Sequence, residues 1–364
     1  IHSRVTAFLF LNIDFLLAMC NMQIVNCRQS QTEGASAMQA NEILNRSDFF
    51  TGTDAEIKKA FHKMVATWHP DVCRDPMAGA VMEHLLKLRD RALSGGRAKP
   101  GLQGLERILE TRDGRRLRVG LHSVRASDFG EILVGDQTVT FVFSADAEDI
   151  GQREAKAIET FRYADDKMRK QMVMALPKVL REMPLTGNRH AIVQKRQPGE
   201  VLLADLLERD GPMDPKHAAW LGSGLLNIAC WMSWARMVHG AISPEMILVD
   251  TATHNVRLIG GWGMSLGMGE RPDILPERTV QRLPRLAVAG QTVDSSVDLE
   301  LIRLTVSEAL GQKNLKAILP KEMFAWLSFP PRKTAMEDYA AWHEALVAAW
   351  GPRKFVQYGG MTDY

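Results

Sequence analysis

Three consecutive residues, His69, Pro70 and Asp71, are the clearest candidates for chemistry in this chain. The proline ring restricts its own backbone torsion and so holds the segment in one shape. A carboxylate is a strong hydrogen-bond acceptor, particularly toward a charged donor. Taken alone, the tripeptide fits a plain helix terminator.

Two helical segments flank the tripeptide. Thr53 and Glu56 have the spacing of a capping box, which predicts that a helix begins there. Apolar residues then recur on one helical face, at Ile57, Phe61, Val65 and Trp68. A second apolar helical pattern begins after Pro76. The two segments predict an antiparallel hairpin whose connecting loop exposes the tripeptide.

The sequence AEIKKAFHKMVATWHPD, followed by an apolar helix that ends in RDRAL, resembles the J domain of DnaJ-type co-chaperones. The resemblance covers residues 39–94. It implies that the histidine and aspartate of the tripeptide trigger the ATPase of a DnaK-type heat-shock chaperone. It also implies that Lys58, Lys59 and Lys63 meet an acidic surface of that chaperone, where such charges raise the association rate more than the affinity. A solvated helix face is the alternative for the lysines.

A second set of residues lies in MVHGAISPEMILV (237–249) and VRLIGGWGMS (256–265). They follow a strand-rich region, a helix around Glu154, and a strand and linker at 192–198. This order resembles that of protein kinases, with the two sequences in the places of the catalytic loop and the magnesium loop. The resemblance covers residues 105–315 and implies a two-lobed domain; a different fold with a similar pattern is the alternative.

Most of the charged residues of the kinase signature are replaced by other residue types in this sequence. His239 matches the histidine of the catalytic loop, but Ala241 stands in place of the catalytic aspartate and Met246 in place of the metal-binding asparagine. The magnesium-binding aspartate falls on Gly260 or Gly261, depending on the register. Phosphoryl transfer needs these carboxylates and a cation on the phosphates. The sequence therefore predicts a catalytically inactive pseudokinase, and it leaves ATP binding open.

Two acidic residues keep their places in this outline. Glu154 stands where kinases have the glutamate that pairs with a lysine, although the strand TVTFVFSA offers no lysine. Asp298 stands where kinases have an aspartate that braces the catalytic loop. A helix N-cap explains Asp298 equally well. His217, Trp220 and Cys230 belong to a long apolar helix and are expected to be core residues.

The expected fold class is α+β and multidomain, with an N-terminal all-α J-domain hairpin followed by the two-lobed kinase-like domain. Glycine and proline punctuate SGGRAKPG, which marks the main boundary. The expected segments are a leader (1–38), the J domain (39–94), a linker (95–101), the kinase-like domain (102–320, with lobes 102–198 and 199–320) and a C-terminal helical extension (321–364).

Amino-acid composition limits the kinds of protein that this chain can be. The chain has 364 residues, of which 46% are hydrophobic and 24% charged, as in an ordinary globular protein. Its 45 Lys and Arg against 43 Asp and Glu leave a net charge of +2. This charge is too small to hold a nucleic acid through many phosphate contacts, so we expect no nucleic-acid partner. The four cysteines have no C-x-x-C spacing, so we expect reduced thiols in the cytoplasm, no metal and no cofactor.

The apolar run at 7–19 is shorter than the roughly 20 residues that span a bilayer. It is interpreted as an artefactual or disordered leader, a targeting segment or a docked helix, and Met38 is a candidate start. We expect no membrane partner.

The leading hypothesis is a J-domain co-chaperone that recruits a DnaK-type chaperone, with residues 102–364 binding an unknown client. The alternatives are an active atypical phosphotransferase with an appended J domain, and a non-enzymatic adaptor that borrows the chaperone pathway.

Overall fold

The computed structural model describes residues 40–44, 50, 54–68, 73, 75–92, 105–288, 290–352 and 358. The tripeptide 69–71, the leader 1–38 and the linker 95–101 lie outside the described residues.

Three helices make up the described amino-terminal region: α2 (Ala40–Leu44), α3 (Asp54–Trp68) and α4 (Ala78–Ala92). Helices α3 and α4 form where the apolar spacing predicts them, and they pack against each other. Their buried side chains are Ile57, Phe61, Val65, Trp68, Val81, Met82, Leu85 and Leu88. This stripe is what makes two short helices stable, because an isolated helix of this length is marginal in water.

Strands dominate the next region. They are β1 (Leu105–Glu110), β2 (Arg116–Leu121), β3 (Ser123–Ser127), β4 (Gly130–Val134), β5 (Thr138–Phe143), β6 (Val179–Pro184) and β7 (His190–Lys195). Strands β1 and β2 form an antiparallel hairpin, and the other five form an antiparallel sheet of order β3-β4-β5-β7-β6. The strands predicted between residues 104 and 145 are confirmed.

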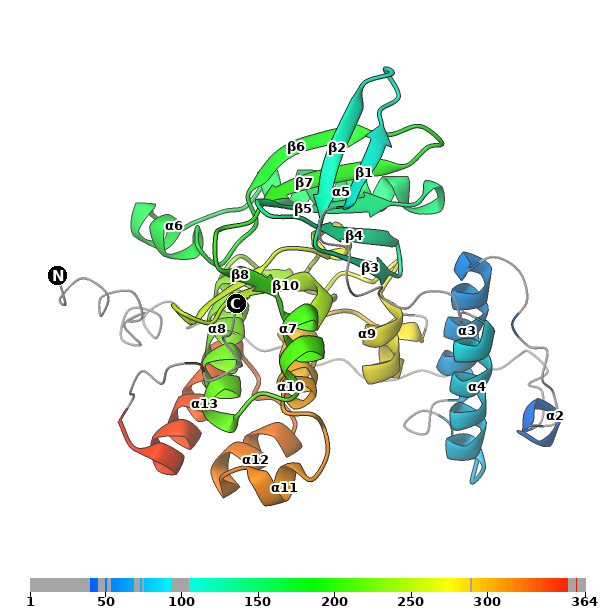
Figure 1. Ribbon diagram of the computed structural model, residues 1–364. Coiled ribbons are helices and arrows are strands. Elements are labelled where there is room, and N and C mark those ends of the chain that lie inside the picture. Colours follow the sequence, from blue (N-terminus) through cyan, green and yellow to red (C-terminus); the bar gives the residue numbers. More distant parts are fainter. Residues whose placement is uncertain are drawn as a thin grey trace.

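The sheet is covered on both faces (Figure 1). Side chains alternate along each strand. Leu133, Val142 and Val193 belong to an apolar cluster with side chains of the β1–β2 hairpin. Ile132, Phe141 and other residues belong to a second cluster with α5 (Glu148–Glu159). Helix α5 follows β5 through the 3₁₀ helix η2 (Ala145–Ala147) and contacts β5, β6 and β7.

The apolar spacing of residues 151–182 predicts helix throughout this segment, and the prediction is wrong at its end. Helix α6 (Asp166–Met172) stops before Pro177, and the chain then forms β6. The apolar residues of this segment fit either a helix or a strand. The segment forms a strand because it pairs with β7.

The remaining chain is mainly helical. Its helices are α7 (Leu203–Asp210), α8 (Pro215–Trp234), α9 (Glu277–Arg282), α10 (Ser295–Ala309), α11 (Leu315–Ile318), α12 (Lys321–Ser328) and α13 (Ala335–Trp350), with 3₁₀ helices η3 (Pro244–Met246), η4 (Trp262–Met264) and η5 (Pro284–Ala287). Short strands are β8 (Glu200–Leu202), β9 (Met237–Val238), β10 (Ile247–Asp250), β11 (Asn255–Leu258) and β12 (Leu266–Gly267).

Helix α8 is the centre of this helical region. It contacts α10, α13 and β11, and its residues His217, Trp220 and Cys230 are buried as predicted. The indole Nε1 of Trp342 on α13 donates to Ser223 Oγ at 3.0 Å. The part of 321–364 that the structure describes therefore shares the apolar core of α8.

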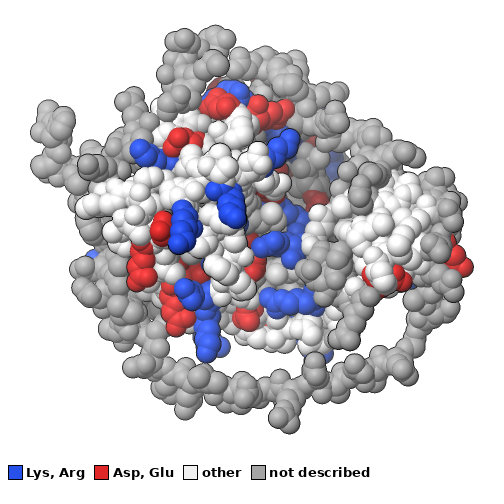
Figure 2. Space-filling view, turned by 90° about the horizontal axis from the view of Figure 1, so that it is seen from below, with Lys and Arg blue, Asp and Glu red and all other residues white. Residues whose placement is uncertain are grey.

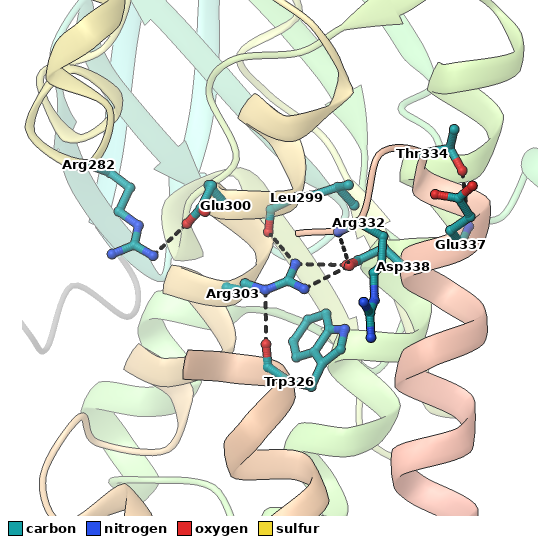
Figure 3. A network of polar contacts seen from close by, with 9 residues as sticks. All are labelled: Arg282, Leu299, Glu300, Arg303, Trp326, Arg332, Thr334, Glu337 and Asp338. Carbon is teal, nitrogen blue, oxygen red and sulfur yellow. Dashed lines mark hydrogen bonds and ion pairs between the residues drawn. The ribbon is translucent and has the colours of Figure 1, made fainter. Parts of the chain in front are cut away.

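A buried ion pair joins α10 to α13 (Figure 3). Arg303 Nη1 and Nη2 donate to the two carboxylate oxygens of Asp338 at 2.7 and 2.8 Å, and Nε donates to the Trp326 carbonyl at 3.1 Å. The guanidinium also lies 4.0 Å from the Trp326 ring centroid. Asp338 accepts a further hydrogen bond from Arg332 N at 2.9 Å. The ion pair and its hydrogen bonds thus connect helices α10, α12 and α13.

The amino-terminal helices contact the helical region. Helix α3 lies against α9 and η5, and its buried side chains form one apolar cluster with those of Val280, Leu283 and Leu286. Acidic and basic side chains both lie on the face of the molecule that is seen from below (Figure 2). Within the described residues, no helix is long and apolar enough to cross a membrane.

Candidate functional site

The turn at residues 260–263 is the centre of the candidate site. Gly261 has a φ of +87°, which L side chains rarely adopt. A Cβ at this position would lie 2.7 Å from the Ala241 Cβ and 2.8 Å from His239 Cε1. A Cβ at Gly263 would lie 2.3 Å from the Ile150 carbonyl of α5. The turn therefore requires glycine because two other segments pack directly onto its backbone.

Glu154 connects α5 to this turn. Its side chain is fully buried, and Gly263 N donates to Oε2 at 3.0 Å. Burial raises the pKa of this carboxyl to about 7, and hydrogen bonds from the backbone of Gly263, Gly261 and Trp262 oppose the rise. The partners of Glu154 are thus backbone N–H groups, where the family outline would have a lysine.

Glu154 makes the stability of the fold depend on pH. Its pKa is higher in the folded protein than its ordinary value of 4.5, so the folded protein holds the proton more tightly. The resulting stabilisation is complete below pH 4.5 and is lost as the pH rises through 7. Between pH 5 and pH 8 the loss is on the order of 2–3 kcal/mol. We expect Glu154→Gln to remove this part of the pH dependence, as urea unfolding at the two pH values would measure.

Glu159, an exposed residue at the end of the same helix, provides the control. Glu159→Gln should leave the pH dependence at its wild-type value. A Glu154→Gln protein with the wild-type difference between pH 5 and pH 8 would contradict the assignment.

The histidine of the candidate site is buried and neutral. Burial lowers the pKa of His239 to about 3, although a hydrogen bond with the Gly260 backbone opposes this. Ala241 N donates to Nδ1 at 3.2 Å, which places the ring proton on Nε2. The imidazole packs edge-on against Trp262, with ring centroids 4.5 Å apart. The geometry thus makes His239 part of the packing between the two loops.

Asp298 holds the segment that contains His239. Its carboxylate accepts from His239 N at 2.9 Å and from Gly240 N at 2.8 Å. Burial raises the pKa of the carboxyl to about 6, and both hydrogen bonds oppose this. The N-cap alternative for Asp298 is wrong, because Asp294 caps α10 by accepting from Ser296 N at 2.8 Å. Asp298 lies within the first turn and points its carboxylate at the 239–240 backbone.

The structure brings the six predicted positions of the kinase outline together around the turn. Glu154 and Gly261 meet through the backbone of 261–263, and Ala241 and His239 pack on Gly261. Met246 packs on the neighbouring glycine, since a Cβ at Gly260 would lie 2.6 Å from its sulfur. Asp298 joins the group through the 239–240 backbone.

An apolar cluster fills the space between the sheet and these loops. Phe141 on β5 projects toward the turn, and its ring would lie 2.5 Å from a Cβ at Gly260. The same cluster contains Ala241, Leu248 and Ile259 from the helical region and Ile132 from the sheet. On the side of Gly260, the nearest side-chain groups are therefore a phenyl ring and a thioether, which are poor ligands for magnesium.

Polar contacts at the surface join the sheet to the helical region on either side of this cluster. On β3, Arg125 Nε donates to Asp205 of α7 at 2.6 Å, and the guanidinium also pairs with Glu208. At the turn after β3, Asp128 accepts from Glu277 N of α9 at 2.6 Å. These hydrogen bonds and ion pairs were not predicted from the sequence. The contacting residues lie about 80 and 149 positions apart, so no spacing rule relates them.

The predicted chaperone-contact residues are only partly described. Lys59 and Lys63 are exposed on α3, on the side away from its buried stripe. Lys58 lies on the same helix. His69, Pro70 and Asp71 lie outside the described residues. The histidine, cysteine and acidic side chains that the structure describes form no group of three able to hold a metal ion.

No protein-family model matches this sequence, and no curated protein matches it significantly.

Proposed function

We propose that this protein is a J-domain co-chaperone that recruits a DnaK-type chaperone and stimulates its ATPase, and that its kinase-like domain is a non-catalytic module that binds a client. The observation that carries the proposal is the arrangement of α3. The helix buries one apolar stripe against α4 and exposes Lys59 and Lys63. It ends at Trp68, immediately before the sequence His69-Pro70-Asp71.

The α3 arrangement supports recognition rather than catalysis. Two exposed lysines on one helix suit an acidic partner surface, and a carboxylate that follows them suits a partner arginine. The stimulated ATPase would belong to the partner. As with any effector, stimulation requires that the co-chaperone bind one conformational state of the chaperone more tightly than the other.

The candidate site supports an inactive kinase-like domain. A sheet with α5 across it leads through β7 into a helical region, the element order that the kinase resemblance implies. Asp298 braces the 239–240 backbone as the resemblance implies. Phosphoryl transfer is almost entirely positioning and electrostatic stabilisation. Ala241, Met246 and Gly261 supply neither.

The experiment is a steady-state ATPase assay of a DnaK-type chaperone with the full chain added. We expect the wild-type protein to stimulate hydrolysis and Asp71→Asn to return it to the basal rate, because an amide loses the charge that a partner arginine needs.

Asp75 supplies a matched control in the same connection. It is exposed, and its Oδ1 accepts from Met77 N at 2.8 Å, a contact that Asp75→Asn can keep. This variant should stimulate like the wild type. Full stimulation by the Asp71→Asn protein would refute the proposed function.

A further inference from the structure

The surface formed by the end of α6 and the start of β6 is unusually basic. Residues 167–181 read KMRKQMVMALPKVLR, with five Lys or Arg and no acidic residue, and Asp165, Asp166 and Glu182 flank them. We define the basic-aliphatic patch as Lys170, Val173, Met174, Lys178, Leu180 and Arg181, all of which are exposed. Arg169 is left out because its guanidinium lies over Tyr163 and near Asp166.

The aliphatic members of the patch are exposed although the segment is well anchored. Val173, Met174 and Leu180 are 57%, 40% and 51% exposed. The segment beneath them is held by Leu258 N, which donates to the Ala175 carbonyl, and by Asn255 Nδ2, which donates to the Met174 carbonyl, each at 3.0 Å. The exposure is therefore built into the fold. Contiguous exposed apolar side chains mark interaction sites.

Leu180 owes its exposure to an irregularity in the sheet. Val179 pairs with Gln194 and Arg181 pairs with Val193, so Leu180 is an extra residue on the edge strand β6. Such bulges often redirect a side chain at a sheet edge. Here the bulge leaves a leucine exposed next to Arg181.

The side chains of this region distinguish between kinds of partner. Helix α6 projects from the edge of the sheet, at the opposite end of the molecule from α3 and α4 (Figure 1). The exposed basic and aliphatic side chains of the patch suit a partner that is anionic at its surface and apolar beneath. A bilayer that contains anionic lipids has both properties.

We propose that the basic-aliphatic patch binds reversibly to anionic membrane surfaces. The basic side chains meet the lipid headgroups, and Val173, Met174 and Leu180 enter the interfacial region. Each basic side chain near such a surface strengthens binding about fivefold. The binding is peripheral and needs no membrane-spanning helix.

The test measures cosedimentation of the full chain with vesicles of phosphatidylcholine, with and without about 30% phosphatidylserine. We expect binding to the anionic vesicles that weakens with salt. Lys170→Glu/Lys178→Glu should lower the partition coefficient by about 25-fold or more. Val173→Ser/Leu180→Ser should also lower it, at unchanged net charge.

Control variants change equivalent exposed residues elsewhere. Lys313→Glu/Lys316→Glu alters the net charge equally, and Ile318→Ser removes another exposed aliphatic side chain. Both should bind like the wild type, and thermal melts should show that all variants fold.

Three results would overturn the proposal: no binding to the anionic vesicles, equal binding to the neutral ones, or an equal loss in the control variants. Displacement by soluble polyglutamate, together with full binding of Val173→Ser/Leu180→Ser, would assign the patch to an acidic protein instead.

Discussion

Replacing Asp338 with alanine is expected to lower the free energy of unfolding by about 3–5 kcal/mol. The substitution leaves the Arg303 guanidinium, which is only 2% exposed, without its carboxylate. It also removes the acceptor for Arg332 N in the loop that leads into α13. An uncompensated buried charge is among the costliest defects that a single substitution can make. Urea unfolding followed by tryptophan fluorescence measures the loss.

The ion pair between Arg282 and Glu300 provides the comparison. Their side chains approach to 2.5 Å, but the arginine is 40% exposed. Solvent screening limits such a pair to about 1 kcal/mol or less. Glu300→Ala should therefore have a small effect. The double variant Arg303→Met/Asp338→Leu should be more stable than Asp338→Ala, because it leaves no charge buried. Equal losses for Asp338→Ala and Glu300→Ala would contradict this account.

Replacing Asp298 with alanine is expected to cost about 2–4 kcal/mol. Two buried backbone N–H groups, at His239 and Gly240, lose their acceptor. Each such group costs about 1–3 kcal/mol when it is left unsatisfied. Removal of a carboxyl whose pKa is raised by burial offsets part of this loss, because the charged form is no longer desolvated.

Asp294 is the matched control for Asp298 because it lies four residues earlier and caps α10. Asp294→Ala should cost about 1 kcal/mol, the usual effect of a lost N-cap. A larger loss for Asp294→Ala than for Asp298→Ala would reverse the roles that the structure gives these two residues. Urea unfolding of both variants under the same conditions decides the matter.

Local patterns predicted the elements of this fold well. The strand-rich pattern ahead of Glu154 predicted β4 and β5, and the spacing of Ile57, Phe61 and Val65 predicted α3. The helical spacing records which face of α3 is buried, and burial is what stabilises it. The segment at β6 was predicted incorrectly because its short apolar run suits a helix or a strand, and only pairing with β7 decides between them.

Contacts between distant residues were harder to predict. The sequence placed Glu154 and Asp298 in the site but left their partners open. Those partners are backbone N–H groups, which every residue except proline carries and which leave no mark in the sequence. Arg303 and Asp338 lie 35 positions apart, and nothing distinguishes them from other charged residues until the helices pack. The sequence therefore predicted which residues lie in the elements and in the candidate site. It did not predict which residues contact each other.

The contacts that Arg125 and Asp128 make across the apolar cluster give the sheet and the helical region one shared interior. Contacts of this kind hold the backbone beneath the surface side chains, so less conformational entropy would be lost when a partner binds to that surface. Selectivity would then reside in the contour of the outer surface, and evolution could alter the choice of partner by changing surface side chains while the interior stayed the same.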